Sequence, residues 1–349
     1  MPFTMVLRSS VYLRRIPHSV LKFSGRPSIF YETGAPIRRY VSSMKTIQFL
    51  WLLACCGTLR ADEHHTVLRS ITVGGRERTY RVHVPSAPQK PFPVVLAFHG
   101  GGSDGKEMEK LSDFDALSDA EGFLAVYPEA FERNWNDGRG ATRLRSHRED
   151  VDDVAFVSAL LDALAKEYEI DEKRIFATGI SNGAIFSHTL AARLADRIAA
   201  IAPVVGGMAS KIGEEFQPKR PVAVLVIQST DDPLVPIAGG KIRGLGGREA
   251  GDHGEILGTP EVLKKWASVN GCGDPGTEEG FPDRAPRDGC RAKRQVWSGR
   301  ATISLITVEG GGHTWPGGRQ YLPERLIGRV CRDFDATAAI WDFFKANGR

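Results

Sequence analysis

A serine between two glycines directly follows a run of β-forming residues in the stretch RIFATGISNGAIF, residues 174–186. A helical pattern begins at once, so the chain turns sharply from strand to helix at Ser181. One interpretation is an ordinary turn in which the serine only caps the helix. The other is a nucleophile elbow, G-x-S-x-G, which holds the serine in a strained backbone conformation. Both interpretations belong to α/β proteins, and the surrounding sequence has to choose between them.

Strands and helices are predicted to alternate along most of the chain. Two β-rich runs around Gly74–Gly75 predict an antiparallel hairpin. The run PVAVLVIQS, residues 221–229, is almost continuously apolar, as is typical of a parallel strand covered on both faces. The order predicts a doubly wound, mostly parallel sheet with helices on both faces. Helices are expected near 105–118, 152–168, 181–198, 260–270 and 334–346, and late strands at 294–297 and 302–308.

The first 61 residues differ in composition from the remainder. They hold nine Lys or Arg and one acidic residue, Glu32, whereas the other 288 residues carry 37 basic and 41 acidic groups. Residues 62–349 therefore lack the basic excess that holds a nucleic-acid backbone, and we exclude nucleic acid as a partner. No linker interrupts residues 62–349, which we predict to form a single domain.

The segment MKTIQFLWLLACCGTLRADE, which starts at Met44, resembles an export signal. It has a lysine, an apolar run and then small residues, and the run is too short for a stable membrane span. Cleavage after Ala61 would make residues 44–61 a signal peptide. Alternatively, LLAC at 52–55 resembles a lipobox, which would make residues 44–54 a lipoprotein signal and Cys55 the lipid anchor. We expect a secreted or periplasmic protein, soluble or lipid-anchored.

Residues 1–43 resemble neither a folded domain nor a signal. We interpret them as an upstream extension of the reading frame or as an unusually long first region of the signal.

Three cysteines remain beyond the leader, which contains Cys55 and Cys56. Cys272 and Cys290 bracket a loop rich in glycine, proline and charge, whose closure a disulfide would favour. Cys331 is then expected to be the odd thiol, and a bond from Cys331 to Cys272 is the alternative. None of the cysteines has metal-ligand spacing, and we expect neither a metal nor another cofactor.

Polar residues suited to catalysis follow three of the predicted strands. Ser181 follows RIFATGI, Asp231 and Asp232 follow PVAVLVIQST, and His313 follows ATISLITVEGGG. The carboxyl ends of parallel strands meet at one edge of a sheet, where function gathers. The chain order Ser, Asp, His is that of α/β-hydrolases. The nucleophile elbow is therefore the interpretation that we adopt.

A glycine loop supplies the donors that acyl transfer needs for its oxyanion. The stretch FHGGGSDG, residues 98–105, follows an early strand and matches the HGGG-type motif of esterases. We expect the region of Gly100 and Gly101 to provide one backbone N–H, and Asn182 the other. The dinucleotide and P-loop glycine patterns are absent, which disfavours a phosphate-binding role.

The chain resembles the secreted feruloyl esterases and polyhydroxybutyrate depolymerases, which overlap carbohydrate esterase family one. The resemblance covers most of residues 75–346 and is carried by LAFHGGGSDG, YPEAFERNWNDGRG, VDDVAFV, the stretch around GISNG, TDDPLVP and GGGHTWPGG. It implies Ser181 as nucleophile, His313 as base and Asp232, directly before P-x-V-P, as the triad acid. The family usually has His-Gly where this chain has Gln228–Ser229. The HGC-x-Q loop frequent in polymer depolymerases is replaced by HGGGSDG, which disfavours a polyester substrate.

We therefore expect an exported, metal-free serine carboxylic-ester hydrolase. Its expected substrates are feruloyl or acetyl esters of plant polysaccharide, or short polyhydroxyalkanoate esters. A serine peptidase on the same fold and a non-catalytic binding protein are the alternatives. Trp135 and Trp315 flank the expected cleft, either as an aromatic wall for substrate or as packing residues. Asp152 and Asp153 are expected to cap the following helix.

Overall fold

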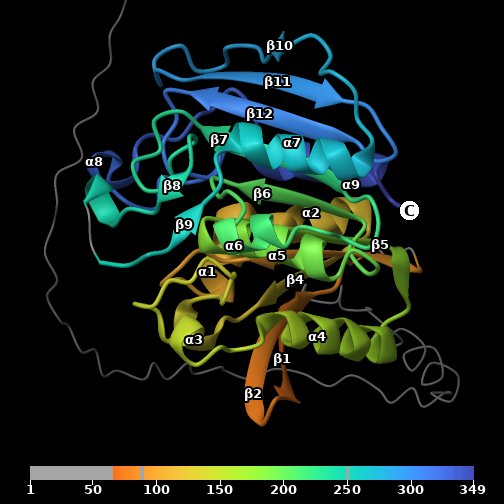
Figure 1. The fold of residues 1–349 in the computed structure, drawn as a ribbon. Helices are drawn as coiled ribbons and strands as arrows, with labels where there is room; N and C mark the ends of the chain where they lie inside the picture. Colours follow the sequence, from red (N-terminus) through yellow and green to blue (C-terminus); the bar gives the residue numbers. More distant parts are fainter. Residues whose placement is uncertain (1–65, 87–89, 249–250) are drawn as a thin grey trace, which may run out of the picture. The chain divides into compact units, whose positions relative to one another are not determined.

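The computed structural model describes residues 66–86, 90–248 and 251–349 (Figure 1). All of them belong to one compact unit. The predicted leader, its cleavage sites and the anchor Cys55 lie outside the described residues. No helix in these ranges combines the length and apolar character needed to cross a bilayer.

Ten of the described strands form one sheet in the order β1-β2-β4-β3-β5-β6-β7-β12-β11-β10. The six neighbours from β4 to β12 pair in parallel, whereas the strands at both ends pair antiparallel. The predicted doubly wound, mostly parallel sheet is confirmed. The strands of this sheet are β1 Thr66–Val73, β2 Arg76–His83, β3 Phe92–Phe98, β4 Leu124–Pro128, β5 Ile170–Ile180, β6 Ala200–Val204, β7 Ala223–Ser229, β10 Glu279–Gly280, β11 Arg291–Trp297 and β12 Ile303–Glu309.

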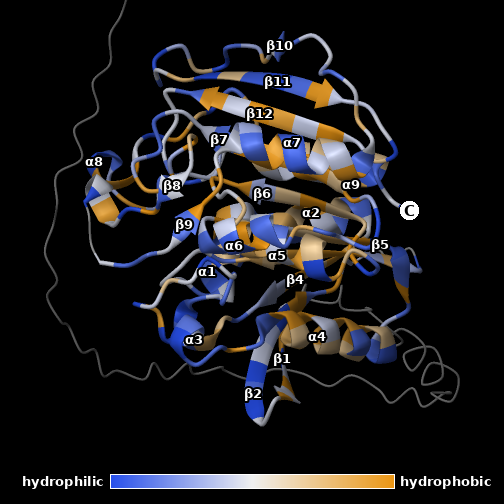
Figure 2. Cartoon of the chain, in the orientation of Figure 1, coloured by the Kyte–Doolittle hydropathy of each residue, from blue (hydrophilic) through white to orange (hydrophobic). Residues whose placement is uncertain are grey.

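Helices cover both faces of the sheet, and each face has its own hydrophobic core. Helices α4, α5 and α7 pack in one core, and α1, α2 and α9 pack in the other. Every residue of β3, β6 and β7 is buried between these layers, and Figure 2 shows hydrophobic residues along β6 and β12, whereas β2 is largely hydrophilic. The α-helices are α1 Gly105–Ser112, α2 Phe114–Glu121, α3 Arg145–Arg148, α4 Asp153–Glu167, α5 Asn182–Arg193, α6 Ser210–Glu214, α7 Thr259–Asn270, α8 Glu324–Ile327 and α9 Ala336–Ala346. The short strands β8 Gly240–Lys241 and β9 Glu255–Ile256 form a separate two-stranded sheet.

The predicted hairpin is present, and one predicted helix is divided. Strands β1 and β2 pair directly across Gly74–Gly75, and both glycines have positive φ, as the tightest hairpin turns require. The helix expected near 105–118 is instead α1 followed by α2. Asp113 separates them with a φ of 52°, a left-handed conformation that ends α1.

The predicted disulfide between Cys272 and Cys290 is wrong for this structure, in which both residues are free thiols. The Cys272 sulfur lies 3.5 Å from the carbonyl oxygen of Ala301, close to the end of β11. Cys290 directly precedes the first residue of β11. A seven-residue strand is roughly 20 Å long, so the two sulfurs sit at opposite ends of it.

A buried ion pair joins the hairpin to helix α4. An Arg78 Nη lies 2.6 Å from an Asp153 carboxylate oxygen, and both side chains are almost completely buried. The other oxygen of Asp153 accepts a hydrogen bond from the Asn136 N–H. Burial raises the pKa of Asp153. Asp152 caps helix α4, because its side chain accepts a hydrogen bond from the Ala155 N–H. Asp153 does not cap the helix; its carboxylate forms the ion pair with Arg78.

We predict that Asp153→Ala lowers the free energy of unfolding by about 3–5 kcal/mol, because it leaves the Arg78 guanidinium buried without its counter-ion. Lys219→Ala is the matched control, since it breaks an exposed pair with Asp196 and should cost less than about 1 kcal/mol. Chemical denaturation measures both. Equal, small losses in the two variants would contradict the assigned role of the buried pair.

Candidate active site

Ser181 occupies the single residue between strand β5 and helix α5. Its φ of 58° and ψ of −120° lie outside the regions that L-residues ordinarily adopt, which marks local backbone strain. Backbone hydrogen bonds on both sides of Ser181 hold this conformation. The Ser181 N–H donates to the Val204 carbonyl at the end of β6, and the Ser181 carbonyl accepts from the Ile185 N–H in the first turn of α5.

The flanking glycines are required by a close approach of strand β3. A Cβ atom on Gly179 would lie 2.5 Å from the Phe98 carbonyl oxygen, and one on Gly183 only 2.2 Å from the same atom. Neither contact is tolerable for a side chain, so only glycine fits at these positions. The two glycines therefore allow the end of β3, and the loop after it, to lie directly beside Ser181.

A carboxylate and an imidazole meet at the ends of β7 and β12. His313 Nδ1 lies 2.7 Å from Asp232 Oδ2, and both side chains are buried. Asp232 Oδ1 accepts hydrogen bonds from the N–H groups of Leu234 and Val235, which fix the carboxylate. Because a carboxylate only accepts hydrogen bonds, His313 Nδ1 carries the proton and Nε2 is left as the basic nitrogen.

The neighbouring acid is placed differently. Asp231 is exposed, and its carboxylate accepts a hydrogen bond from the Thr230 hydroxyl.

Ser181 is half-buried at the end of β5, two strands away from β7 in the sheet order. Among the described residues, the ring contact of His313 is to Asp232, and no hydrogen bond joins it to the Ser181 hydroxyl.

The glycine loop after β3 lies against the elbow. A methyl group on Gly100 would be 3.5 Å from the Ser181 Cβ, and one on Gly101 would be 3.7 Å from the Asn182 Cβ. The N–H groups of the first turn of α5, including that of Asn182, have no partner within the helix. Gly100, Gly101 and Asn182 thus lie together beside Ser181, as an oxyanion site requires.

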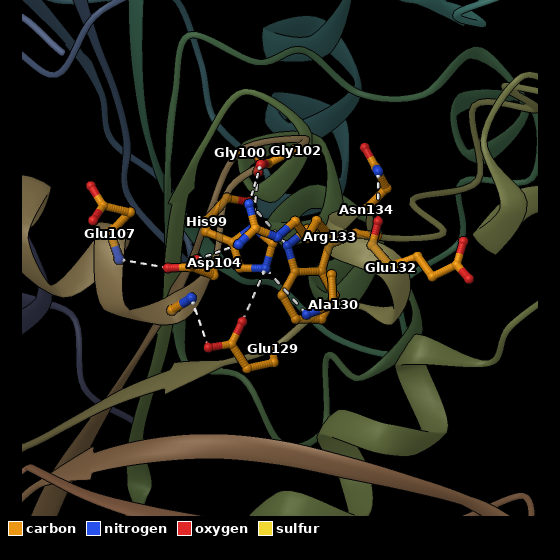
Figure 3. Close-up of polar contacts among 12 residues, drawn as sticks. His99, Gly100, Gly102, Asp104, Glu107, Glu129, Ala130, Glu132, Arg133 and Asn134 are labelled. Atoms are coloured by element: carbon orange, nitrogen blue, oxygen red, sulfur yellow. Dashed lines mark hydrogen bonds and ion pairs between the residues drawn. The ribbon is translucent and has the colours of Figure 1, made fainter.

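Buried hydrogen bonds fix the shape of this loop (Figure 3). His99 Nδ1 lies 2.8 Å from the Gly100 carbonyl oxygen, and its Nε2 lies 3.1 Å from the Ala130 nitrogen. The first contact requires a proton on Nδ1 and the second an unprotonated Nε2, so the imidazole is neutral. Burial lowers the pKa of His99 to about 4, which keeps it neutral at physiological pH. Arg133 accepts a hydrogen bond from the Gly102 N–H through its carbonyl oxygen.

The side chain of Asn182 is tied to a segment that precedes helix α4. Its carbonyl oxygen accepts from the Trp135 N–H, and its amide group donates to the Trp135 carbonyl and to the Asp137 carboxylate. Asp137 is fully buried, and its backbone carbonyl accepts from the Thr189 hydroxyl. We did not single out Asp137 from the sequence. The motif NWNDGRG contains it, but nothing in that motif shows that its carboxylate reaches α5.

Neither tryptophan forms an aromatic wall in this structure, because both indole rings are fully buried. Trp135 stacks on Phe186 with ring centroids 5.0 Å apart and donates to the His99 carbonyl. Trp315 donates to the Thr337 hydroxyl on the opposite side of the sheet. The packing interpretation is therefore the one that the structure supports.

A second residue that we did not single out supports His313. The Tyr321 hydroxyl donates to the His313 carbonyl at 2.7 Å, and burial raises the pKa of this phenol. This hydrogen bond helps to fix the backbone of the loop that carries His313.

Comparisons with known proteins agree with this fold. The family described as "Esterase PHB depolymerase" matches residues 79–256. The relative named "Putative esterase NocK", from Nocardia uniformis subsp. tsuyamanensis, is 33% identical over 80% of this chain and 82% of its own length. Feruloyl esterase B of Piromyces equi is 27% identical over 64% of this chain and 40% of its own length.

A solved structure adds to the evidence for the fold alone. Acetyl xylan esterase from Aspergillus awamori superimposes with a TM-score of 0.52 at 17% identity, over 71% of this chain and 94% of that one. The parallel sheet and the family match together show that the chain is an esterase of the α/β-hydrolase fold and belongs to the esterase PHB depolymerase family.

Proposed function

We propose that the chain is a serine esterase in which Ser181, His313 and Asp232 act as a catalytic triad. The observation that carries this proposal is the buried pair of Asp232 and His313, which shares one sheet edge with a strained serine. The pair provides an oriented base, and the strain presents the serine hydroxyl at the start of a helix.

The proposed reaction has two halves. His313 Nε2 takes the proton of the Ser181 hydroxyl as the oxygen attacks the ester carbonyl, and then gives it to the departing alcohol. In the second half, His313 takes a proton from water as the water attacks the acyl-enzyme, and the carboxylic acid is released. Asp232 holds the imidazole tautomer and stabilises the imidazolium in both halves. Backbone N–H groups of Asn182 and of Gly100 or Gly101 stabilise the oxyanion.

We further propose that the substrate is an acyl ester of a carbohydrate, with a feruloyl or acetyl group. Relatives include a feruloyl esterase, and polar side chains border the glycine loop. The Asn134 side-chain oxygen would lie 3.0 Å from a methyl group on Gly101, and the Arg133 side chain is largely exposed beside Gly102. A polar border suits sugar hydroxyls better than the apolar surface of a polyester.

We predict that feruloyl and acetyl xylo-oligosaccharides are hydrolysed with a higher kcat/KM than hydroxybutyrate oligomers, and that peptides are not cleaved. Ser181→Ala is the control: it should abolish ester turnover and stoichiometric labelling by a fluorophosphonate probe. Preferential turnover of hydroxybutyrate oligomers would contradict the proposed substrate class. Labelling that persists in Ser181→Ala would contradict the assignment of Ser181 as the nucleophile.

A second prediction separates the two adjacent acids. Asp232→Asn should lower kcat by on the order of 10⁴, because the amide no longer fixes the histidine tautomer. Asp231→Asn should keep most activity, since this exposed carboxylate bonds only locally to Thr230. Steady-state kinetics on one ester decide the matter, and the reverse order of losses would overturn the assignment of the acid.

We also propose that the protein is exported, on the strength of the apolar run that follows Met44. The mature protein should then begin after Ala54, with lipid on Cys55, or after Ala61. N-terminal sequencing and intact mass of protein recovered from the envelope or medium test this. Recovery of the full-length chain from the cytoplasm would refute export.

A further inference from the structure

Two cysteines that are 41 positions apart lie close together, next to the segment that packs against the His313 loop. Cys290 precedes strand β11 and Cys331 lies before helix α9, and both side chains are buried. The two sulfur atoms and a carboxylate oxygen of Asp288 all lie within 4.8 Å of one another. These three residues, which we name the Cys290 cluster, take no part in the proposed ester chemistry.

Hydrogen bonds that Asp288 accepts from two backbone N–H groups hold the two segments together. One Asp288 carboxylate oxygen accepts from the Cys290 N–H at 2.8 Å, and the other accepts from the Arg332 N–H at 2.9 Å. The Asp288 carbonyl also accepts from the Arg329 guanidinium. The thiols therefore face each other across a scaffold that is already fixed, so joining them needs little backbone movement.

The same contacts disfavour a metal in the cluster. Both carboxylate oxygens of Asp288 already accept hydrogen bonds from backbone N–H groups. A zinc ion takes four ligands, so it would need one of these oxygens beside the two thiolates and a further group as the fourth ligand. Cys290 and Cys331 are 1% and 0% exposed, which leaves no space for a water ligand. A bond between two sulfurs needs no further group.

We propose that Cys290 and Cys331 form a disulfide in the mature protein, with glutathione disulfide or a protein disulfide as the oxidant. One cysteine thiolate attacks the oxidant and displaces its first thiolate, which gives a mixed disulfide. The second cysteine thiolate then attacks the protein sulfur of that mixed disulfide and displaces the second thiolate. Two protein thiols are oxidised to one disulfide, the oxidant is reduced to two thiols, and the cysteine protons pass to solvent or to the released thiolates.

The two thiols lie close enough to change each other's acidity in the folded chain. The hydrogen bond from Cys290 lowers the pKa of Cys331, while the same contact and burial raise the pKa of Cys290. Because both sulfurs are buried in the folded chain, the bond closes before the region packs fully.

The cross-link would secure the segment that supports His313. The His313 N–H donates to the Ile327 carbonyl, the Gly312 N–H to the Arg329 carbonyl at 3.0 Å, and the Gly317 N–H to the Cys331 carbonyl at 2.8 Å. Residues 327–331 thus run alongside 312–317. A bond from Cys331 to Cys290 ties this support to the sheet at the start of β11.

Peptide mapping tests the proposal on the wild-type protein without a substitution. The protein is equilibrated in a glutathione buffer, its free thiols are alkylated without reduction, and the digest is analysed by mass spectrometry. We expect a linked peptide pair containing Cys290 and Cys331, and alkylated Cys272. Mapping assigns each cysteine separately, so Cys55 and Cys56 do not affect the result.

Thermal unfolding gives a second readout with a matched control. Reduction should lower the Tm of the wild type and of Cys272→Ala by on the order of 5 °C, because it releases a constraint on the unfolded chain. Reduction should leave the Tm of Cys290→Ala unchanged.

Three results would overturn the proposal: alkylation of both Cys290 and Cys331, a linkage of either to Cys272, or one equivalent of bound zinc with both thiols retained. None of these measurements depends on the ester chemistry, so the cross-link and the proposed function can fail separately.

Discussion

The close approach of strand β3 to the turn after β5 is the constraint on which the site depends. The Phe98 carbonyl occupies the space that a side chain at Gly179 or Gly183 would need, so the turn must be glycine on both sides of Ser181. The serine of this turn has a strained conformation, and Gly100 lies beside it. One steric contact therefore connects the proposed nucleophile with the proposed oxyanion donors.

Buried polar groups hold the two sides of this contact. On one side, neutral His99 bridges Gly100 and Ala130 and shapes the glycine loop. On the other, Asn182 is held by the Trp135 backbone and by Asp137, which fixes the start of helix α5. Groups of this kind are costly to bury unless each is satisfied, and here their hydrogen bonds set the direction of the N–H groups around Ser181. The proposed oxyanion site is thus supported largely by side chains outside the proposed triad.

Local patterns predicted much of the fold, and tertiary contacts account for the rest. The apolar run that became β7 and the helical stripe of α4 carry their periodicity in the sequence, so sheet type and strand-end residues could be predicted. Asp153 was expected to cap α4, but its partner Arg78 lies 75 positions earlier, and no local pattern indicates such a pair. The disulfide prediction failed similarly, because loop composition does not reveal that β11 separates the two sulfurs.

The central claim is that Ser181, Asn182 and the Gly100 loop form one acyl-transfer site, and a crystal structure of the phosphonylated protein tests it directly. We predict phosphorus bonded to the Ser181 hydroxyl oxygen, with the phosphoryl oxygen accepting hydrogen bonds from the backbone N–H of Asn182 and of Gly100 or Gly101. Phosphorus on another residue, or a phosphoryl oxygen turned to solvent without these donors, would contradict the account.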